Sequence, residues 1–267
     1  MIANSKTVMA TVRDALRTKF LRVAVACLIP FITGMILVVT FSMLFEALPK
    51  IIVAILAAAA VFFILYPIIM GTVRFFVRFI KGGIEEDAAA VFYYFTSGRK
   101  YGKILYLQII LLIKKLGVGL VTALPMLIAW VISGSFVYDL FNIAMPIWAQ
   151  SVSYIIIYLR VLGFVAYFLI TLRYYLAPFL LAADEGMHAA EAVYMSKLIS
   201  KRTLIDFVFL LFSHIIYILL SFILLPAVFT LPYLVGAYVV HCDSAVEQYN
   251  NTVKKLSEED TLYIEEV

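Results

Sequence analysis

Long apolar runs, each close to the length of a bilayer crossing, constrain this chain more than any other feature. The first two run from about Leu21 to Phe45 and from Ile51 to Val73. A helix needs about 20 apolar residues to cross the hydrocarbon core. Hydrophobic residues make up 65% of the chain and charged residues 14%, against about 45–50% and about 25% in soluble domains. The sequence therefore predicts an all-α fold, a polytopic membrane helix bundle.

The alternation of apolar runs and polar stretches predicts six transmembrane helices plus cytoplasmic amphipathic helices. We expect one membrane domain over residues 1–250 and a charged cytoplasmic tail over residues 251–267. The spans are expected at about 21–45, 51–73, 108–131, 151–176, 204–225 and 233–250.

The start of the third span is open, because two charges interrupt its apolar run. The run begins at Ile104, and Lys114 and Lys115 lie within it. Either the span starts near Leu116 after an interfacial helix, or it starts near Ile104 and both lysines extend along the helix to the membrane surface. We place the start between these limits.

The distribution of cations predicts the orientation. The segments 1–22, 74–115, 173–202 and 254–255 hold 19 of the 21 lysines and arginines. Lysine and arginine accumulate on the cytoplasmic side of membrane proteins. We therefore expect a multi-pass protein of the cell membrane with both termini in the cytoplasm, which requires an even number of spans.

Three polar segments have the pattern of surface helices. Residues 1–20 combine cations with apolar residues at helical spacing, which predicts a basic amphipathic helix on the membrane surface. Two further helices are expected, one with the acidic residues 85–87 in its first turn and one from Asp184 to Ser200. The last two segments share a layout. This reflects either an internal repeat or the common composition of inner loops.

The cations of these inner segments are candidate contacts for lipid headgroups. A lysine or arginine near an anionic membrane surface contributes about 1 kcal/mol. The alternative is that these residues only set the topology. We expect the bilayer, with anionic lipids at the cytoplasmic face, and a membrane protein as partners, and no nucleic acid. The candidate contacts are Arg74, Arg78, Lys81, Arg99, Lys100, Lys201 and Arg202.

Two ionisable residues lie deep in predicted spans. Arg160 is about ten residues into the fourth span, hence about 14 Å deep, and His214 lies at a similar depth in the fifth. A charge at that depth costs several kcal/mol unless it is paired or hydrated. They predict a polar site near the midplane. Alternatively, Arg160 bonds to backbone carbonyls or to hydroxyls such as Ser133 or Ser135, or extends outward, and His214 donates to a backbone carbonyl.

No pattern in the sequence predicts catalysis, a cofactor or a metal. Nucleotide-binding glycine loops and hydrolase motifs are missing. His188 with Glu185 and Glu191 has helical spacing, but such metal sites usually include another histidine or a cysteine. A solvated helix surface explains these three residues better. We therefore expect a chain without enzymatic activity.

Several short pieces, in order over about residues 60–250, resemble a bacterial membrane-protein family. With them the chain resembles the domain-of-unknown-function 975 family of six-span proteins of Gram-positive bacteria, and more remotely the membrane domain of glycerophosphodiester phosphodiesterases. The resemblance implies an architecture and no reaction. The pieces are Gly71-x-x-Arg74, Phe92–Phe95, Tyr101-x-Lys103, Pro178–Ala182, Ala192-x-x-x-Ser196 and Pro232-Tyr233.

Two functions fit this reading of the chain. The first is a non-enzymatic accessory or scaffold protein that contacts lipid or protein partners through its cytoplasmic helices. The alternative is a transporter or lipid-handling protein with a midplane cavity around Arg160.

Overall fold

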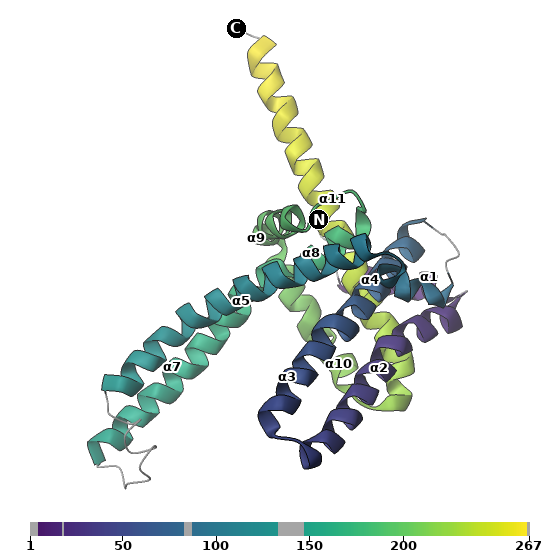
Figure 1. Cartoon of the computed structure of the whole chain (residues 1–267). Coiled ribbons are helices and arrows are strands. Elements are labelled where there is room, and N and C mark those ends of the chain that lie inside the picture. The colour runs from purple at the N-terminus through teal and green to yellow at the C-terminus, as the bar shows by residue number, and fades with distance from the viewer. Residues whose placement is uncertain (1–4, 18, 83–86, 133–146, 266–267) are drawn as a thin grey trace. The chain divides into compact units, whose positions relative to one another are not determined.

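The structure is a computed structural model that describes the backbone of residues 5–17, 19–82, 87–132 and 147–265. Every element in these ranges is a helix, so the predicted all-α fold is confirmed (Figure 1). Within the described residues, five helices are long and apolar enough to cross a membrane, which makes this a helical membrane protein. They are Phe20–Ala47, Lys50–Lys81, Gly98–Val131, Tyr154–Ala183 and Leu225–Lys255.

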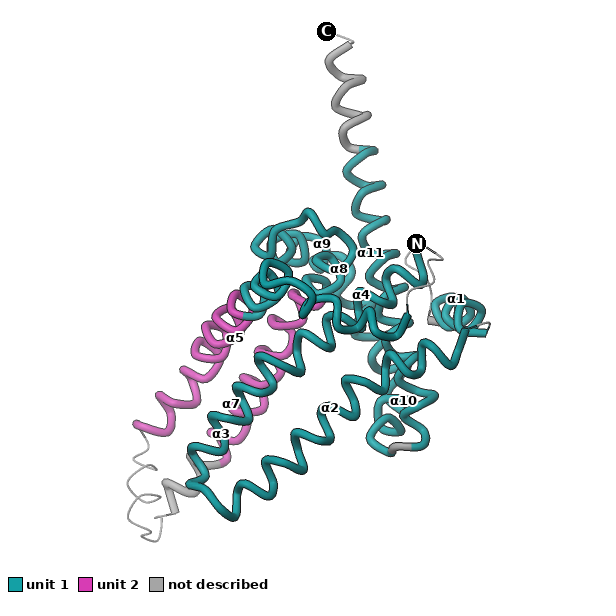
Figure 2. The backbone as a smooth tube through the Cα atoms, turned by 45° about the vertical axis from the view of Figure 1, so that its right-hand side comes forward, with its two compact units in different colours: residues 1–108, 176–267 teal, residues 109–175 magenta. Residues whose placement is uncertain are grey.

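The helices form two compact units (Figure 2). Unit 1 comprises residues 1–108 and 176–267, and unit 2 comprises residues 109–175. The boundary between them falls inside α5 (Gly98–Ile132), a single helix with Pro125 in its interior. Because α5 begins at Gly98 and is continuous, no helix begins at either of the two starts considered for the third span, Ile104 and Leu116.

In unit 1, α1 (Ser5–Arg17) packs against α11 (Leu224–Glu265). Its apolar side chains Val8, Val12 and Leu16 are buried. Gly236 of α11 permits the approach, since a Cβ there would lie 2.7 Å from Val12 Cγ1. The apolar face of this predicted amphipathic helix is covered by protein, and its place on the membrane surface stays a prediction.

The first two predicted spans are confirmed as helices. Regular α-helical hydrogen bonding is interrupted once in each of them. They are α2 (Phe20–Ala47) and the run of α3 (Lys50–Ala60), η1 (Val61–Leu65) and α4 (Tyr66–Gly82). Pro30 of α2 cannot donate to the carbonyl of Ala26, and the Thr72 hydroxyl of α4 lies 3.4 Å from that oxygen. The segment η1 is a π-helix, and the Tyr101 hydroxyl donates to the carbonyl of Phe63 at 2.8 Å.

The end of α4 packs against η2 (Ala88–Thr96) and α8 (Ala177–Ala183). A Cβ at Gly71 would lie 1.7 Å from the carbonyl oxygen of Val91, so only glycine allows η2 to lie this close. Asp87 caps η2 by accepting from the backbone N–H of Ala88 at 2.7 Å. Asp87 thus precedes this helix instead of lying in its first turn as predicted, and the predicted acids 85 and 86 are outside the described residues.

The predicted surface helix and the start of the fifth span form one element, α9 (Ala189–Ser213). A break follows at His214, and α10 (Ile215–Leu220) continues to a turn at residues 221–223. Both His214 Nδ1 and the Ser213 hydroxyl contact the carbonyl of Leu210, at 2.8 and 2.9 Å, and compete with the helical hydrogen bonds there.

The segment 204–225 is therefore not a straight span, and it is not among the five long helices of the described residues. It packs instead against α11 as the second arm of a helical hairpin (Figure 1). The polar tail is not a separate segment either, because α11 continues through Pro232 to Glu265.

Unit 2 consists of the second part of α5, α7 (Ile147–Thr171) and the short η3 (Leu172–Tyr174). The two long helices approach at glycines. A Cβ at Gly163 would lie 2.8 Å from the carbonyl oxygen of Thr122, and one at Gly119 would lie 3.5 Å from the Tyr167 ring. Small residues at such contacts are typical of membrane helix pairs. The predicted outer loop at residues 133–146 is outside the described residues.

Candidate functional site

Three cations meet at one glutamate at the end of α4. Glu185 Oε1 accepts from Arg74 Nη2 at 2.9 Å, from Arg74 Nε at 3.3 Å and from Arg78 Nη2 at 2.5 Å. The backbone carbonyl of Glu185 accepts from Lys103 Nζ at 2.6 Å. The Tyr93 side chain also hydrogen-bonds to the carboxylate. We call these five residues the Glu185 cluster.

Arg74 is the buried centre of the Glu185 cluster. It is 3% exposed, and arginine is almost never fully buried without a partner. Its guanidinium carbon lies 3.4 Å from the centroid of the Tyr93 ring, and Lys100 Nζ lies 3.8 Å from the same centroid. Arg74 thus combines an ion pair with a cation–π contact, which together compensate the loss of hydration.

Four segments build the Glu185 cluster: α4, η2, the bend between α8 and α9, and the start of α5, which supplies Lys103. Arg74 and Arg78 are four residues apart on α4 and so share a face of that helix. Tyr93 comes from η2, which lies close because of Gly71. Glu185 lies in the bend between α8 and α9. In this bend the Asp184 carboxylate accepts a hydrogen bond from the backbone N–H of Gly186 at 2.8 Å.

The charges of the Glu185 cluster do not cancel. Burial alone would raise the pKa of Glu185, but the hydrogen bonds from Arg74 and Tyr93 and the charges of Arg74 and Arg78 lower its pKa below the ordinary value. Glu185 is therefore ionised at neutral pH, and three cations lie around it, one of which, Lys103, also interacts with the neighbouring Asp184 carboxylate. The Glu185 cluster is a positively charged site, and its side chains can bind a further anion.

The seven predicted headgroup contacts divide into three groups. Arg74, Arg78 and Lys100 come together at Glu185 and Tyr93. Lys81 instead pairs with Asp243 of α11 at 2.5 Å, with its ammonium 5.5 Å from the centroid of the Phe179 ring. The remaining three cations are exposed, Arg99 at the start of α5 and Lys201 and Arg202 on α9.

Arg160 and His214 belong to different units, so their joint midplane site stays a prediction. Arg160 is exposed on α7. His214 is 3% exposed, with Nδ1 2.8 Å from both the Leu210 carbonyl and the Ser213 hydroxyl. This geometry matches the alternative in which His214 donates to a backbone carbonyl. Its Nε2 is buried and has no hydrogen-bond partner among the described residues. Ser133 and Ser135 lie outside the described residues.

Sequence reasoning missed Glu185 as the centre of this site. It placed Glu185 on the same helix as His188 and Glu191, but α9 begins only at Ala189. Glu191 instead accepts from the backbone N–H of His188 at 3.5 Å, as part of a capping box. The signal that could have found the site is the pair Arg74 and Arg78, which repeats at helical spacing at the end of an apolar run. Among the described residues, no group of three or more acids, histidines or cysteines is arranged to hold a metal.

Comparison with known proteins adds no assignment. No protein-family model, curated protein or solved structure matches the chain.

Proposed function

We propose that this chain is a non-enzymatic accessory protein of the cell membrane that binds anionic lipid headgroups through the Glu185 cluster and the cations beside it. The observation that carries the proposal is the convergence of Arg74, Arg78 and Lys103 on Glu185. This surplus of positive charge lies at the end of α4, which completes one of the apolar spans.

The buried and exposed cations have different parts in this proposal. Arg74 holds the carboxylate in place and is too buried to reach a lipid. The side chain of Arg78 is 35% exposed, and Arg99 is exposed at the start of α5. Guanidinium groups match the geometry of phosphate oxygens and bind them with two parallel hydrogen bonds. These accessible cations, together with Lys100, are the proposed headgroup contacts, on the cytoplasmic side by the positive-inside rule.

We also propose membership of the domain-of-unknown-function 975 family. The Gly71-x-x-Arg74 piece of the resemblance has a physical reason in this fold. Gly71 admits the backbone of Val91, and Arg74 then reaches both Tyr93 and Glu185. Gly71 and Arg74 have separate structural roles, and both roles need this spacing. The Gly71-x-x-Arg74 piece therefore supports the resemblance.

Thermal stability with added lipid tests the headgroup proposal. Purified full-length protein in a neutral detergent is melted with phosphatidylglycerol or with phosphatidylcholine. A ligand that binds only the folded state stabilises it by about 2.7 kcal/mol at 100 times its Kd. We therefore expect phosphatidylglycerol to raise the Tm by several degrees and phosphatidylcholine to raise it much less.

Two matched variants locate the effect. The triple variant Arg78→Gln, Arg99→Gln and Lys100→Gln should lose more than half of the shift caused by phosphatidylglycerol. A control variant with three lysines elsewhere changed, Lys50→Gln, Lys114→Gln and Lys115→Gln, should keep it. Equal shifts in the two variants would show that net charge, and not this site, attracts the lipid.

A further inference from the structure

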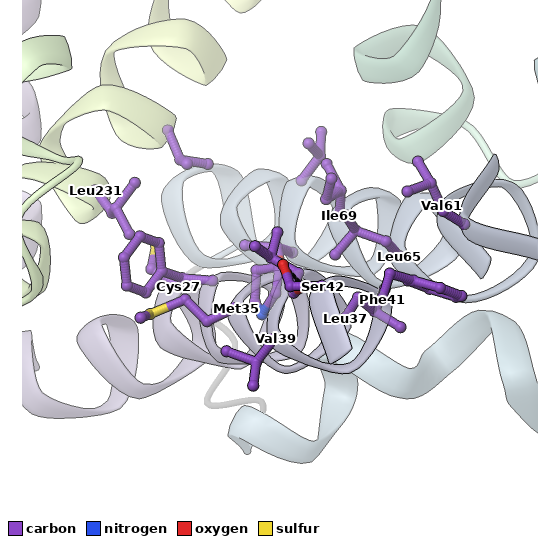
Figure 3. A pocket seen from close by; sticks show the side chains of 18 of the residues that line it. Cys27, Met35, Leu37, Val39, Phe41, Ser42, Val61, Leu65, Ile69 and Leu231 are labelled. Atoms are coloured by element: carbon purple, nitrogen blue, oxygen red, sulfur yellow. Dashed lines mark hydrogen bonds between the residues drawn. The ribbon is translucent and has the colours of Figure 1, made fainter. Parts of the chain in front are cut away.

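A second feature of unit 1 is a long apolar groove between α2, the α3–η1–α4 run and α11 (Figure 3). Its volume is about 790 Å³, which is within the range of about 300–1,000 Å³ that is typical of ligand sites. Cys27 and Leu231 lie at one end, and Phe41 and Val61 lie at the other. The groove follows two apolar spans, so its surroundings are those of the bilayer interior.

The lining of the groove excludes a polar ligand. Its two hydroxyl groups belong to Ser42 and Thr72. The Ser42 hydroxyl donates to the carbonyl of Val38 at 2.8 Å. The Thr72 hydroxyl lies 3.2 Å from the carbonyl of Ile68, besides its contact with α2. Since both hydroxyls are bonded to backbone and the other lining side chains are apolar, a sugar or nucleotide would lose its hydration without compensation.

The helices that form the groove depart from regular α-helical hydrogen bonding at two places. At each place a side-chain hydroxyl contacts a backbone carbonyl. Val61 and Leu65, the first and last residues of the π-helix η1, both line the groove, and π-helical turns occur frequently at functional sites. The Tyr101 hydroxyl satisfies a carbonyl of this turn, and Thr72 reaches the carbonyl that Pro30 leaves open. The groove is therefore stabilised at these two places by hydroxyl groups, one from Thr72 in its wall and one from Tyr101 outside it.

The length of the groove suits a hydrocarbon chain. From Cys27 to Phe45 the helix α2 advances by 18 residues, about 27 Å at about 1.5 Å per residue. This is close to the ~30 Å thickness of the hydrocarbon core of a bilayer, so the groove offers an apolar wall along most of the depth that acyl chains occupy.

One end of the groove leads to the Glu185 cluster. Thr72 and Val73 line this end, Arg74 follows directly, and Arg78 lies one turn further along α4. We propose that the groove binds an acyl chain of an anionic phospholipid whose headgroup lies at Arg78. The headgroup part rests on the proposed function, and the acyl-chain part stands on the groove alone.

Photolabelling tests the groove. The full chain is reconstituted in vesicles of phosphatidylcholine and phosphatidylglycerol that contain a trace of phosphatidylglycerol with a diazirine in its acyl chain, and labelled residues are mapped by mass spectrometry. We expect labelling of the groove residues of α2 and α4 to exceed that of the lipid-accessible helix α7 by at least threefold. Labelling of the groove at or below the level of α7 would overturn the proposal.

Two glycine-to-leucine variants, one that fills the groove and one outside it, test the proposal further. A Cβ at Gly34 would lie 3.9 Å from Leu65, an ordinary contact, so Gly34→Leu should fold and project into the groove. Gly117→Leu is the control, because a Cβ there meets nothing within 4 Å. Gly34→Leu should lower groove labelling at least threefold and leave α7 unchanged, whereas Gly117→Leu should leave both unchanged. Unchanged groove labelling in a folded Gly34→Leu would contradict the proposal.

Two further outcomes separate the groove from the headgroup site. Groove labelling by a diazirine phosphatidylcholine as strong as that by phosphatidylglycerol would support an acyl-chain groove and contradict the anionic preference of the proposed function. Cross-links between two copies of the chain at groove residues would identify a second copy as the occupant and overturn the acyl-chain proposal.

Discussion

The two compact units contain the most and the least covered of the apolar spans. Half of the most apolar stretch of Leu225–Lys255 is buried, in α11 of unit 1, whereas the share is 6% in Tyr154–Ala183, most of which belongs to unit 2, and 17–22% in the other three spans. Unit 1 buries large side chains such as Phe75, Phe76 and Phe179 almost completely. The described apolar side chains of unit 2 lie largely at its surface.

This contrast shows that the two units depend on their surroundings to different degrees. Unit 1 has close backbone approaches, a buried ion pair and aromatic packing, so its shape follows from its own residues. The α5–α7 hairpin of unit 2 has glycine contacts and little other burial, and lipid or another protein must cover the rest. We therefore expect substitutions at the contacts of unit 1 to cost more stability than equivalent substitutions in unit 2.

Gly71→Ala should have the largest effect. The added Cβ would lie 1.7 Å from the Val91 carbonyl oxygen, so η2 must move away from α4. Overpacking typically costs 1–3 kcal/mol, and displacement of a whole helix belongs at the upper end, about 3 kcal/mol. Melting followed by circular dichroism should show a Tm far below wild type. Gly117→Ala, with open space around its Cβ, should melt at or above it.

Arg74→Gln should cost about 2 kcal/mol, because it removes a charged hydrogen-bond donor, worth about 1.5–3 kcal/mol, from a buried position. Arg78→Gln removes a cation from the same carboxylate at a position with 35% side-chain exposure and should cost less than about 1 kcal/mol. Chemical denaturation of the two variants side by side measures the difference. Equal costs would show that burial of Arg74 does not matter for stability.

Gly163→Ala should affect unit 2 alone and cost about 1 kcal/mol. The new Cβ would lie 2.8 Å from the Thr122 carbonyl oxygen, and a lightly packed hairpin can separate slightly to relieve the contact. Both tryptophans, Trp130 and Trp148, belong to unit 2, so tryptophan emission reports this region. The emission should shift in Gly163→Ala and stay unchanged in Gly71→Ala below its Tm. A shift of equal size in both variants would argue against separate units.

The smallest predicted effect is the pH dependence that Glu185 contributes to unit 1. Its pKa in the folded protein is lowered, so the ionised form favours folding. This stabilisation is fully present above the unfolded pKa of about 4.3 and is lost as the pH falls through the folded pKa. The Tm advantage of wild type over Glu185→Gln should therefore shrink as the pH falls below about 5. An advantage that grows on acidification would contradict the ion-pair geometry.

The helices and the membrane character of the chain could be predicted from its sequence, because apolar length alone determines them. The interruption of the 204–225 run could not, because it depends on Ser213 and His214 competing for one carbonyl, which apolar composition does not show. The covered face of α1 could not be predicted either. An amphipathic pattern is the same whether lipid or α11 lies against it.

Only two cations of the Glu185 cluster were predicted. Arg74 and Arg78 stood out because positive charge at the end of a span is visible in the sequence, whereas Lys103 was not among the predicted headgroup contacts. Glu185 and Tyr93 lie far from them in the chain. They come together only because Gly71 lets η2 approach α4, a contact between segments that no local pattern specifies.

The central claim is that the accessible cations beside Glu185 bind anionic headgroups, and native mass spectrometry of retained lipids tests it most directly. Wild type and the triple variant Arg78→Gln, Arg99→Gln and Lys100→Gln are released from mixed vesicles holding equal amounts of phosphatidylglycerol and phosphatidylcholine. We expect wild type to retain phosphatidylglycerol preferentially and the variant to retain the two lipids about equally. The same strong preference in both proteins would contradict the claim.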